Sequence, residues 1–309
     1  MLRVVTLLTL VGLFVYGVSK WFGYFPFIET KEVIIIVIFI VFLTVLFQYG
    51  DDLMERLKKM GPMEFFEKKI NEIHFDERFL PDPILSKSFN PSEKISMEES
   101  FKYQISDLFI NFLEFSNIDL MKLKNRDKLL QIIRSVGTIA FYQKDYFKAI
   151  SRFEKLRDLV GNSYDKSYAI GLSYLKIANS EEEVNKKRIY FEKSLENFNS
   201  AKQLQKDDHD VYYHIAWVLD ELGRFEEAIE NNKKCLVLKS DFYPAQYNIA
   251  VSLTKMGKYK DAFNELQKIP ENKEVWETAS VDDELEKLRN HEEFGKKVRE
   301  LIDRRLGKN

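Results

Sequence analysis

The sequence has few of the residue types on which several classes of protein depend. It contains a single cysteine among 309 residues, so no disulfide can form within the chain. Its seven prolines and twelve glycines are few for this length, as is typical of a chain that is mostly helical. Lysine and arginine total 47 against 49 acidic residues, and the net charge of −2 argues against a nucleic-acid binder attracted by a strongly basic surface.

Recognisable catalytic and metal-binding motifs are also missing from the sequence. It has no glycine-rich phosphate-binding loop and no nucleophile elbow. Its four histidines, His74, His209, His214 and His291, are scattered without the spacing of metal ligands. The sequence therefore predicts a protein that is not an enzyme and uses no cofactor or metal, with Cys235 as a packing residue.

What the sequence does contain is a 34-residue repeat, clearest between His209 and Trp276. Large apolar, small and glycine positions of the first half mostly recur in the second. The first half has Tyr212, Ile215, Ala216, Leu219, Leu222, Gly223, Phe225, Ala228, Ile229 and Cys235, and the second has Gln246, Ile249, Ala250, Leu253, Met256, Gly257, Tyr259, Ala262, Phe263 and Ile269. A fixed period of this length indicates a solenoid. The apolar spacing on either side of Gly223 predicts two helices per unit.

The period extends upstream and predicts four units, at 130–163, 164–208, 209–242 and 243–276. In the first unit, Lys144 stands where the later units have glycine. The second unit fits only with an insertion of 11 residues, and we expect these polar residues, around 179–187, to form a loop between its two helices. Four units in phase predict an all-α solenoid of about four helix pairs.

Further apolar helices are expected at both ends of the repeats. An apolar helix that begins after Ser96, with Glu99 completing a capping box, is expected to cover the first unit. A single helix at 280–305, started by Ser280 and Asp283, is expected to cover the last unit. The predicted solenoid domain, including these capping helices, therefore spans 97–309.

The repeats resemble the tetratricopeptide repeat (TPR) family. The third unit carries Tyr212, Ala216, Leu219, Gly223, Phe225, Ala228 and Cys235 at the family's positions, and Gly257, Tyr259 and Ala262 repeat the centre of that motif. Asn232 and Ser240 depart from the family, which usually has an aromatic residue and a proline there. The resemblance covers all four units and implies helix pairs stacked into a right-handed superhelix, whose concave groove binds a protein or peptide.

The resemblance also implies which residues line the groove. Positions 2, 5, 9, 12 and 13 of each first helix correspond to Gln131, Arg134, Thr138, Phe141 and Tyr142, to Asp165, Tyr168, Leu172, Leu175 and Lys176, to Asp210, Tyr213, Trp217, Asp220 and Glu221, and to Pro244, Tyr247, Val251, Thr254 and Lys255. Aromatic residues are frequent in this set, as at recognition surfaces. The residues singled out for partner binding are Arg134, Tyr142, Tyr168, Tyr213, His214, Trp217, Tyr247 and Asn248. The alternative is that some of these aromatic side chains belong to the core. Thr138 and Ala169 stand where family members that clamp a carboxylate need asparagine.

The first 49 residues predict a transmembrane helical hairpin in contact with membrane lipid. Residues 4–18 and 33–47 carry no charge, although each stretch is short against the roughly 20 residues that span a bilayer. Aromatic residues lie between the stretches, and the basic residues after the second one place the remainder of the chain in the cytoplasm. A cleaved signal peptide that leaves one span, and a buried core helix at 33–47, are the alternatives.

Two shorter segments connect the hairpin to the solenoid. Residues 50–75 are expected to form amphipathic helices at the membrane surface, and 76–96 a linker interrupted by Pro81, Pro83 and Pro91. The whole pattern predicts a membrane-anchored adaptor that binds a partner protein or peptide. One alternative is an effector whose hairpin perturbs the bilayer when the repeats sense a partner. Another is an enzyme subunit that positions catalytic partners.

Overall fold

The computed structural model describes residues 120–307, together with 68, 70, 71, 73, 103, 104, 106, 107 and 109–111. The chain divides into two compact units, 1–72 and 73–309, and all the labelled helices belong to the second. The predicted hairpin at 1–49, the linker at 76–96 and most of 50–75 lie outside the described residues. Among the helices that are described, none has the length and apolar character needed to cross a membrane.

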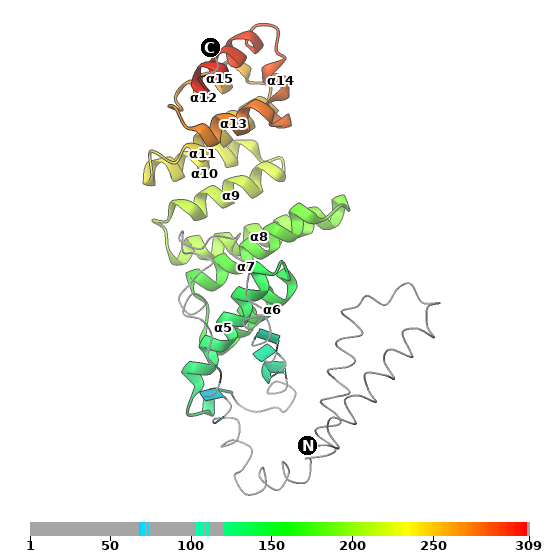
Figure 1. Cartoon of the computed structure of the whole chain (residues 1–309), viewed down its shortest axis with the longest axis vertical. Helices are drawn as coiled ribbons and strands as arrows, with labels where there is room; N and C mark the ends of the chain where they lie inside the picture. The colour runs from blue at the N-terminus through cyan, green and yellow to red at the C-terminus, as the bar shows by residue number, and fades with distance from the viewer. Residues whose placement is uncertain are drawn as a thin grey trace, which may run out of the picture. The chain divides into compact units, whose positions relative to one another are not determined.

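Four helix pairs form the body of the second unit (Figure 1). They are α5 (Arg126–Tyr142) with α6 (Tyr146–Val160), α7 (Tyr164–Ser180) with α8 (Val184–Leu204), α9 (His209–Glu221) with α10 (Phe225–Leu238), and α11 (Tyr243–Lys255) with α12 (Tyr259–Gln267). A short 3-10 helix, η2 (Leu120–Lys122), precedes them. Each helix contacts the next one along the chain, and the described residues include no strand. The predicted all-helical, TPR-like solenoid is confirmed for this part of the chain.

The same turn joins the helices of the first, third and fourth pairs. In the third pair Gly223 has a left-handed φ of 76°, and the amide of Arg224 donates to the carbonyl of Leu219 at 2.8 Å. This six-to-one hydrogen bond is the Schellman motif that closes many helix C-termini. Gly257 and Lys144 occupy the equivalent positions with φ of 74° and 65°. Lys144 therefore adopts the backbone conformation for which the later units use glycine.

Glycine also allows the helices of the first two pairs to approach closely. A β-carbon on Gly171 in α7 would lie 2.9 Å from the ring of Phe198 in α8. A β-carbon on Gly137 in α5 would lie 3.3 Å from the ring of Phe153 in α6. Both phenylalanines are buried. Each ring therefore fills the space above a residue that has no side chain, and this contact sets how near the two helices can come.

The predicted loop at 179–187 is wrong. Only residues 181–183 separate α7 from α8. The inserted residues lengthen the two helices instead, to 17 and 21 residues, against 13 and 14 in the third pair. The inserted segment has no glycine or proline and is rich in glutamate and lysine, which favour helix. Tyr174 and Tyr190 stack across the extended part, with ring centroids 6.3 Å apart.

The single capping helix predicted at 280–305 is also wrong. The structure has α13 (Lys273–Val281), the 3-10 helix η3 (Asp283–Leu285), α14 (Glu286–Arg289) and α15 (Gly295–Arg305). Ser280 lies in the last turn of α13, where its hydroxyl donates to the carbonyl of Glu277, and does not start a helix. Asn272 starts α13 instead, because its side chain accepts a hydrogen bond from the amide of Val275 at 3.1 Å.

The described residues among 103–111 contact α6, in the region after Ser96 where the sequence predicts a helix that covers the first unit. These residues are helical, and Tyr103 and Ile110 are buried. Asp107 binds the guanidinium of Arg152 in α6, with Nε to Oδ1 at 2.9 Å and Nη2 to Oδ1 at 2.8 Å. Arg152 is only 4% exposed, so the ion pair is buried. Removal of Asp107 would leave the buried guanidinium without this opposite charge and would destabilise the fold.

Candidate functional site

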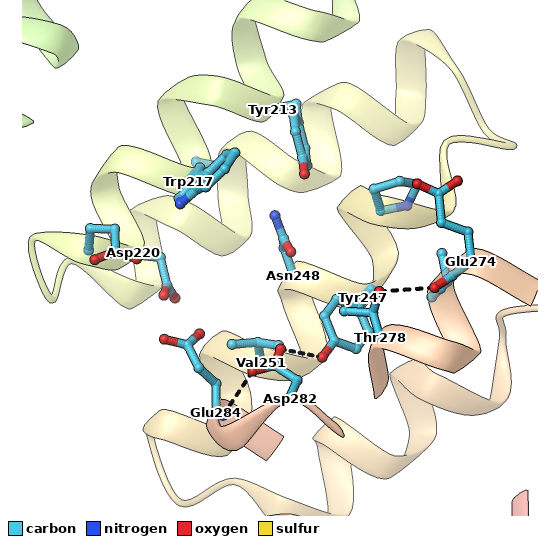
Figure 2. A pocket seen from close by; sticks show the side chains of 14 residues that line it. Tyr213, Trp217, Asp220, Tyr247, Asn248, Val251, Glu274, Thr278, Asp282 and Glu284 are labelled. Atoms are coloured by element: carbon cyan, nitrogen blue, oxygen red, sulfur yellow. Dashed lines mark hydrogen bonds between the residues drawn. The ribbon is translucent and has the colours of Figure 1, made fainter. Parts of the chain in front are cut away.

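A pocket of about 310 Å³ lies between α9, α11 and α13 (Figure 2). Its lining side chains are Tyr213, Ala216, Trp217, Asp220 and Glu221 from α9, Pro244, Tyr247, Asn248 and Val251 from α11, Glu274, Val275 and Thr278 from α13, Asp282 from the turn that follows α13, and Glu284 from η3. The pocket therefore belongs to three successive first helices of the solenoid, the side of each unit that the TPR resemblance assigns to the groove.

One wall of the pocket is aromatic. Tyr213 and Trp217 are four residues apart, so they lie on the same face of α9, and their ring centroids are 6.3 Å apart. Both side chains are partly exposed. Burial raises the pKa of Tyr213, while a hydrogen bond with the side chain of Asn248 opposes that shift. Figure 2 shows Asn248 between this wall and the residues of α13.

The floor of the pocket is formed by Tyr247. Its side chain is only 6% exposed, and its hydroxyl donates to Oδ2 of Asp282 at 2.5 Å. The other carboxylate oxygen of Asp282 accepts from the amide of Glu284 at 2.9 Å. Burial, together with the Asp282 carboxylate, raises the pKa of Tyr247, so the phenol keeps its proton. The Tyr247 hydrogen bond therefore holds α11 against the turn after α13.

Five carboxylates line the pocket, and none of the lysine, arginine or histidine residues that the structure describes does so. Lys255 lies beside the pocket, and its Nζ binds the carboxylates of Asp220 and of Glu284, the latter at 2.8 Å. Asp220 also accepts from the hydroxyl of Ser252 at 2.5 Å. Burial lowers the pKa of Lys255, but its bonds to the two carboxylates outweigh this, and the net shift is upward. Lys255 therefore stays charged.

Three of the five carboxylates have no cation partner in the described part of the chain, and one of them, Asp282, accepts hydrogen bonds from Tyr247 and Glu284 instead. Neither Glu221 nor Glu274 forms an ion pair with any residue in the described part of the chain. Desolvation raises the pKa of Glu221, Lys255 opposes the shift, and the carboxylates of Glu284 and Asp220 add to it. The pocket therefore combines apolar rings with an excess of negative charge, a combination that attracts a positively charged group.

The structure brings together four of the residues that the sequence singles out for binding, Tyr213, Trp217, Tyr247 and Asn248. Two of the remaining four, Arg134 and Tyr142, lie outside this pocket. Arg134 borders a separate pocket of about 280 Å³ and pairs with Asp165 at 3.1 Å. Tyr142 packs edge-on against Phe141, with centroids 5.7 Å apart, and burial raises its pKa to about 12.

Tyr168 packs in the core, which was the alternative for such aromatic residues, and His214 is half-buried beside it. Tyr168 is 5% exposed and belongs to the buried cluster of α7, α8 and α9. His214 lies between Tyr168 and Phe198, with ring centroids 5.6 and 5.4 Å away. Burial lowers the pKa of His214 to about 4, with Lys176 adding to the shift and Asp208 opposing it. The prediction that Tyr168 lines the groove is therefore wrong. For His214 it stays a prediction, because its ring centroid also lies 5.3 Å from that of Tyr213 and 6.3 Å from that of Trp217.

Six pocket residues were missed by the sequence analysis: Ala216, which it used only as a repeat position, and Glu274, Val275, Thr278, Asp282 and Glu284. For the last five the reason is the short α12, because α13 begins 30 residues after α11 and the 34-residue register no longer holds. The apolar spacing of Val275, Trp276 and Ala279 after Asn272 was a signal for an additional helix start. Trp276 is fully buried, and its indole Nε1 donates to the carbonyl of Pro270 at 2.7 Å.

The structure also groups Asp208, His209 and Asp210, whose ligand atoms lie within 4.8 Å of one another. Asp208 already accepts from the hydroxyl of Tyr164 at 2.7 Å and from the amide of Asp210 at 2.8 Å. Nε2 of His209 lies 3.1 Å from Oδ1 of Asp210. These contacts organise the start of α9, with Asp208 as its N-cap.

Comparison with known proteins supports the TPR resemblance for one unit. Residues 209–242, the predicted third unit, match a family model described as Tetratricopeptide repeat. No curated protein matches the sequence. Similar solved structures include a thermophilic TPR protein, TTC0263 of Thermus thermophilus, with 14% identity, a TM-score of 0.40, and coverage of 67% of this chain and 93% of that one.

Two further solved structures are similar at the same level. YrrB, described as a TPR protein with an unusual peptide-binding site, shares 16% identity with a TM-score of 0.41, over 66% of this chain and 93% of that one. Yeast Tom70 shares 16% identity with a TM-score of 0.41, over 98% of this chain and 60% of that one. The repeat assignment therefore rests on the family match at 209–242 and on the helix pairs themselves.

Proposed function

We propose that this chain is a non-enzymatic adaptor, anchored in a membrane by its first 49 residues, that binds a protein or peptide segment in the pocket between α9, α11 and α13. The observation that carries the proposal is the aromatic wall of that pocket. Tyr213 and Trp217 remain partly exposed inside a cavity, whereas most large apolar side chains of the surrounding helices are buried. Rigid aromatic side chains in a concave site are typical anchors for a binding partner.

A peptide segment suits this pocket because successive helices line it. Packed helices lie about 8–10 Å apart, and an extended chain covers about 3.3 Å per residue. About three residues of a bound segment therefore correspond to each layer of the solenoid. The segment would cross α9, α11 and α13 in turn and meet side chains from all three. Arg134 and Tyr142, in the first unit, would meet a longer segment that continued along the same side.

Crosslinking and pulldown with the full-length chain test the partner site. We expect Tyr213→Ala with Trp217→Ala to lose the crosslinked partner that the unchanged chain retains. Phe147→Ala is the matched control, since this aromatic residue is 59% exposed on α6 and lies outside the pocket. Thermal unfolding of each variant confirms that it folds. Retention of the same partner by the double variant would contradict the proposed site.

The membrane anchor is supported by the uncharged stretches 4–18 and 33–47 and by the basic residues Arg56, Lys58 and Lys59 that follow them. Alkaline carbonate extraction of cell membranes tests it. We expect the full-length chain to remain with the membranes and a variant that lacks residues 1–49 to be released. Protease treatment of intact and opened vesicles tests the orientation. Extraction of the full-length chain by carbonate would contradict anchoring while leaving the partner site open to its own test.

A further inference from the structure

We infer that the segment bound in this pocket is basic, and that one of its arginine side chains lies against Trp217 among the surrounding carboxylates. The inference rests on the proposed function, because it gives the chemistry of the segment that the pocket binds. The observation behind it is the negative charge that α13 and the residues directly after it add to the pocket. The repeat pattern does not include these residues.

Charge complementarity excludes an acidic segment. Asp220, Glu221, Glu274, Asp282 and Glu284 line the pocket, and Lys255 supplies one positive charge beside them. A single lysine offsets one of these five negative charges. A segment that brought further carboxylates would face repulsion from several directions at once, whereas a cation would be attracted. The same charge is opposite to that needed to hold the carboxylate of a chain terminus.

The aromatic wall makes the complementarity specific for a flat cation. Trp217 presents the ring type that binds cations best. Asp220 and Glu221 follow it by three and four residues on α9, so their carboxylates lie on the same side of the helix. A guanidinium can stack on an indole and at the same time donate two hydrogen bonds to a carboxylate, which an ammonium cannot do. Figure 2 shows Glu284 facing Trp217 and Asp220 across the opening.

The arrangement of the carboxylates disfavours a bare metal ion as the occupant. A metal ion needs several ligand atoms close together, and within the described residues the acidic and histidine side chains form such a group, within 4.8 Å, at Asp208, His209 and Asp210. The carboxylates of the pocket do not form such a group. Carboxylates that are spread around a cavity of about 310 Å³ instead suit an extended cation with several donors. An arginine side chain offers five N–H donors in one plane.

The test uses the full-length chain and a displayed library of random 12-residue peptides. Selected peptides are sequenced, and the dissociation constant is measured for the most enriched peptide and for its form with arginine replaced by citrulline, the neutral isostere. Both peptides are measured on the unchanged chain and on the Glu221→Gln/Glu274→Gln variant. That variant removes two carboxylates that have no ion-pair partner in the described part of the chain, so the network around Lys255 stays intact.

The matched control is Glu226→Gln/Glu286→Gln, which removes the same charge from exposed residues outside the pocket. We expect arginine to be enriched, and citrulline to weaken binding to the unchanged chain and to the control by about tenfold. We expect a much smaller effect of citrulline on the pocket variant. The pocket variant should also weaken the arginine peptide, and more so at low salt.

Three outcomes separate this inference from the proposed function. Selection of neutral, acidic or purely apolar peptides that lose binding in Trp217→Ala would overturn the basic segment and keep the pocket as the binding site. Selection of no peptide, or of peptides whose binding is unchanged in both the pocket variant and Trp217→Ala, would overturn both. If replacing arginine by citrulline weakened peptide binding equally on the unchanged chain and on the pocket variant, the arginine would bind outside the pocket, and the inference would be overturned.

Discussion

The imidazole of His214 lies parallel to the ring of Phe198, with centroids 5.4 Å apart and planes 9° apart. Tyr168 meets the same imidazole edge-on. Nδ1 of His214 is buried and has no hydrogen-bond partner among the residues the structure describes. Protonation of the imidazole would place a positive charge between aromatic rings, where no carboxylate of the described residues accepts a hydrogen bond from Nδ1. Burial accordingly lowers the pKa of His214 to about 4, from an ordinary value of 6.5.

This pKa difference predicts how stability changes with pH. Between pH 6.5 and 4 the unfolded chain binds a proton at His214 that the folded chain does not. The contribution to stability is therefore full above the unfolded pKa and is lost as the pH falls toward the folded one. We expect the free energy of unfolding to drop by about 2 kcal/mol between pH 7 and pH 5 from this residue alone.

Urea unfolding at both pH values measures this effect. Other groups also titrate in this range, so the comparison is with His214→Phe, which keeps an aromatic ring in the stack and cannot take a proton. Between pH 7 and pH 5, the free energy of unfolding of the variant should fall by about 2 kcal/mol less than that of the unchanged chain. An identical pH dependence in the two proteins would show that His214 is not the group responsible.

Gly171→Ala should destabilise the second helix pair. The added methyl group would lie 2.9 Å from the ring of Phe198, which is completely buried and has little room to move. Overpacking of this kind costs about 1–3 kcal/mol, more than alanine gains in helix propensity. Urea unfolding gives the loss. Restoration of stability in Gly171→Ala/Phe198→Leu would identify the ring as the cause, and an unchanged unfolding midpoint in Gly171→Ala would contradict the close contact.

Lys144→Gly should stabilise the first helix pair. Lys144 has a φ of 65°, a conformation that costs a residue with a β-carbon about 1–2 kcal/mol. Glycine relieves that strain but adds freedom to the unfolded chain, so we expect a net gain of about 0.5–1 kcal/mol. Lys144→Ala is the control, because it removes the lysine side chain and keeps the β-carbon. Equal effects of the two substitutions in thermal unfolding would mean that strain is not the source.

Asn232→Leu should stabilise the third pair. Asn232 is 1% exposed, and neither its Nδ2 nor its Oδ1 has a hydrogen-bond partner in the described part of the chain. Leu266, the equivalent residue of the fourth pair, is fully buried. Since a buried polar group without a partner costs about 1–3 kcal/mol, leucine should raise the free energy of unfolding by a similar amount.

The neighbouring amide serves as the control for this substitution. Asn231 is less buried, and its Nδ2 donates to the carbonyl of Glu227 at 2.9 Å, so Asn231→Leu should bring no gain. Loss of stability in Asn232→Leu would show that the amide makes a contact that the structure does not contain. Circular dichroism of both variants during urea unfolding decides between these results.

The turns of the repeats could be predicted because they depend on a few residues that are adjacent in the chain. Gly223, Gly257 and Lys144 occupy one position of the 34-residue register, and all three adopt the left-handed conformation. The inserted residues of the second unit could not be assigned in this way. A polar segment can be a loop or the exposed part of a helix, and here α7 and α8 extend through it.

Half of the pocket could also be predicted, and the reason is again the register. Tyr213, Trp217, Tyr247 and Asn248 belong to first helices that follow the period, so the register indicates that they lie on one side of the solenoid, and they line one pocket there. Glu274 and Glu284 come after α12, which is shorter than the second helices of the other pairs and shifts the chain out of phase. Their contribution to the pocket depends on how α13 packs, and no sequence period indicates that.

The sequence by itself determined the four helix pairs, their order and the turns of the first, third and fourth pairs, because helical periodicity and helix termination depend on residues close together in the chain. Only the tertiary structure decided which aromatic residues are accessible. Tyr168 and Tyr213 occupy the same position of successive units, yet the first is buried beside Phe198 and His214 while the second lines the pocket. Burial depends on what the next layer places opposite each side chain, and those neighbours are distant in the sequence.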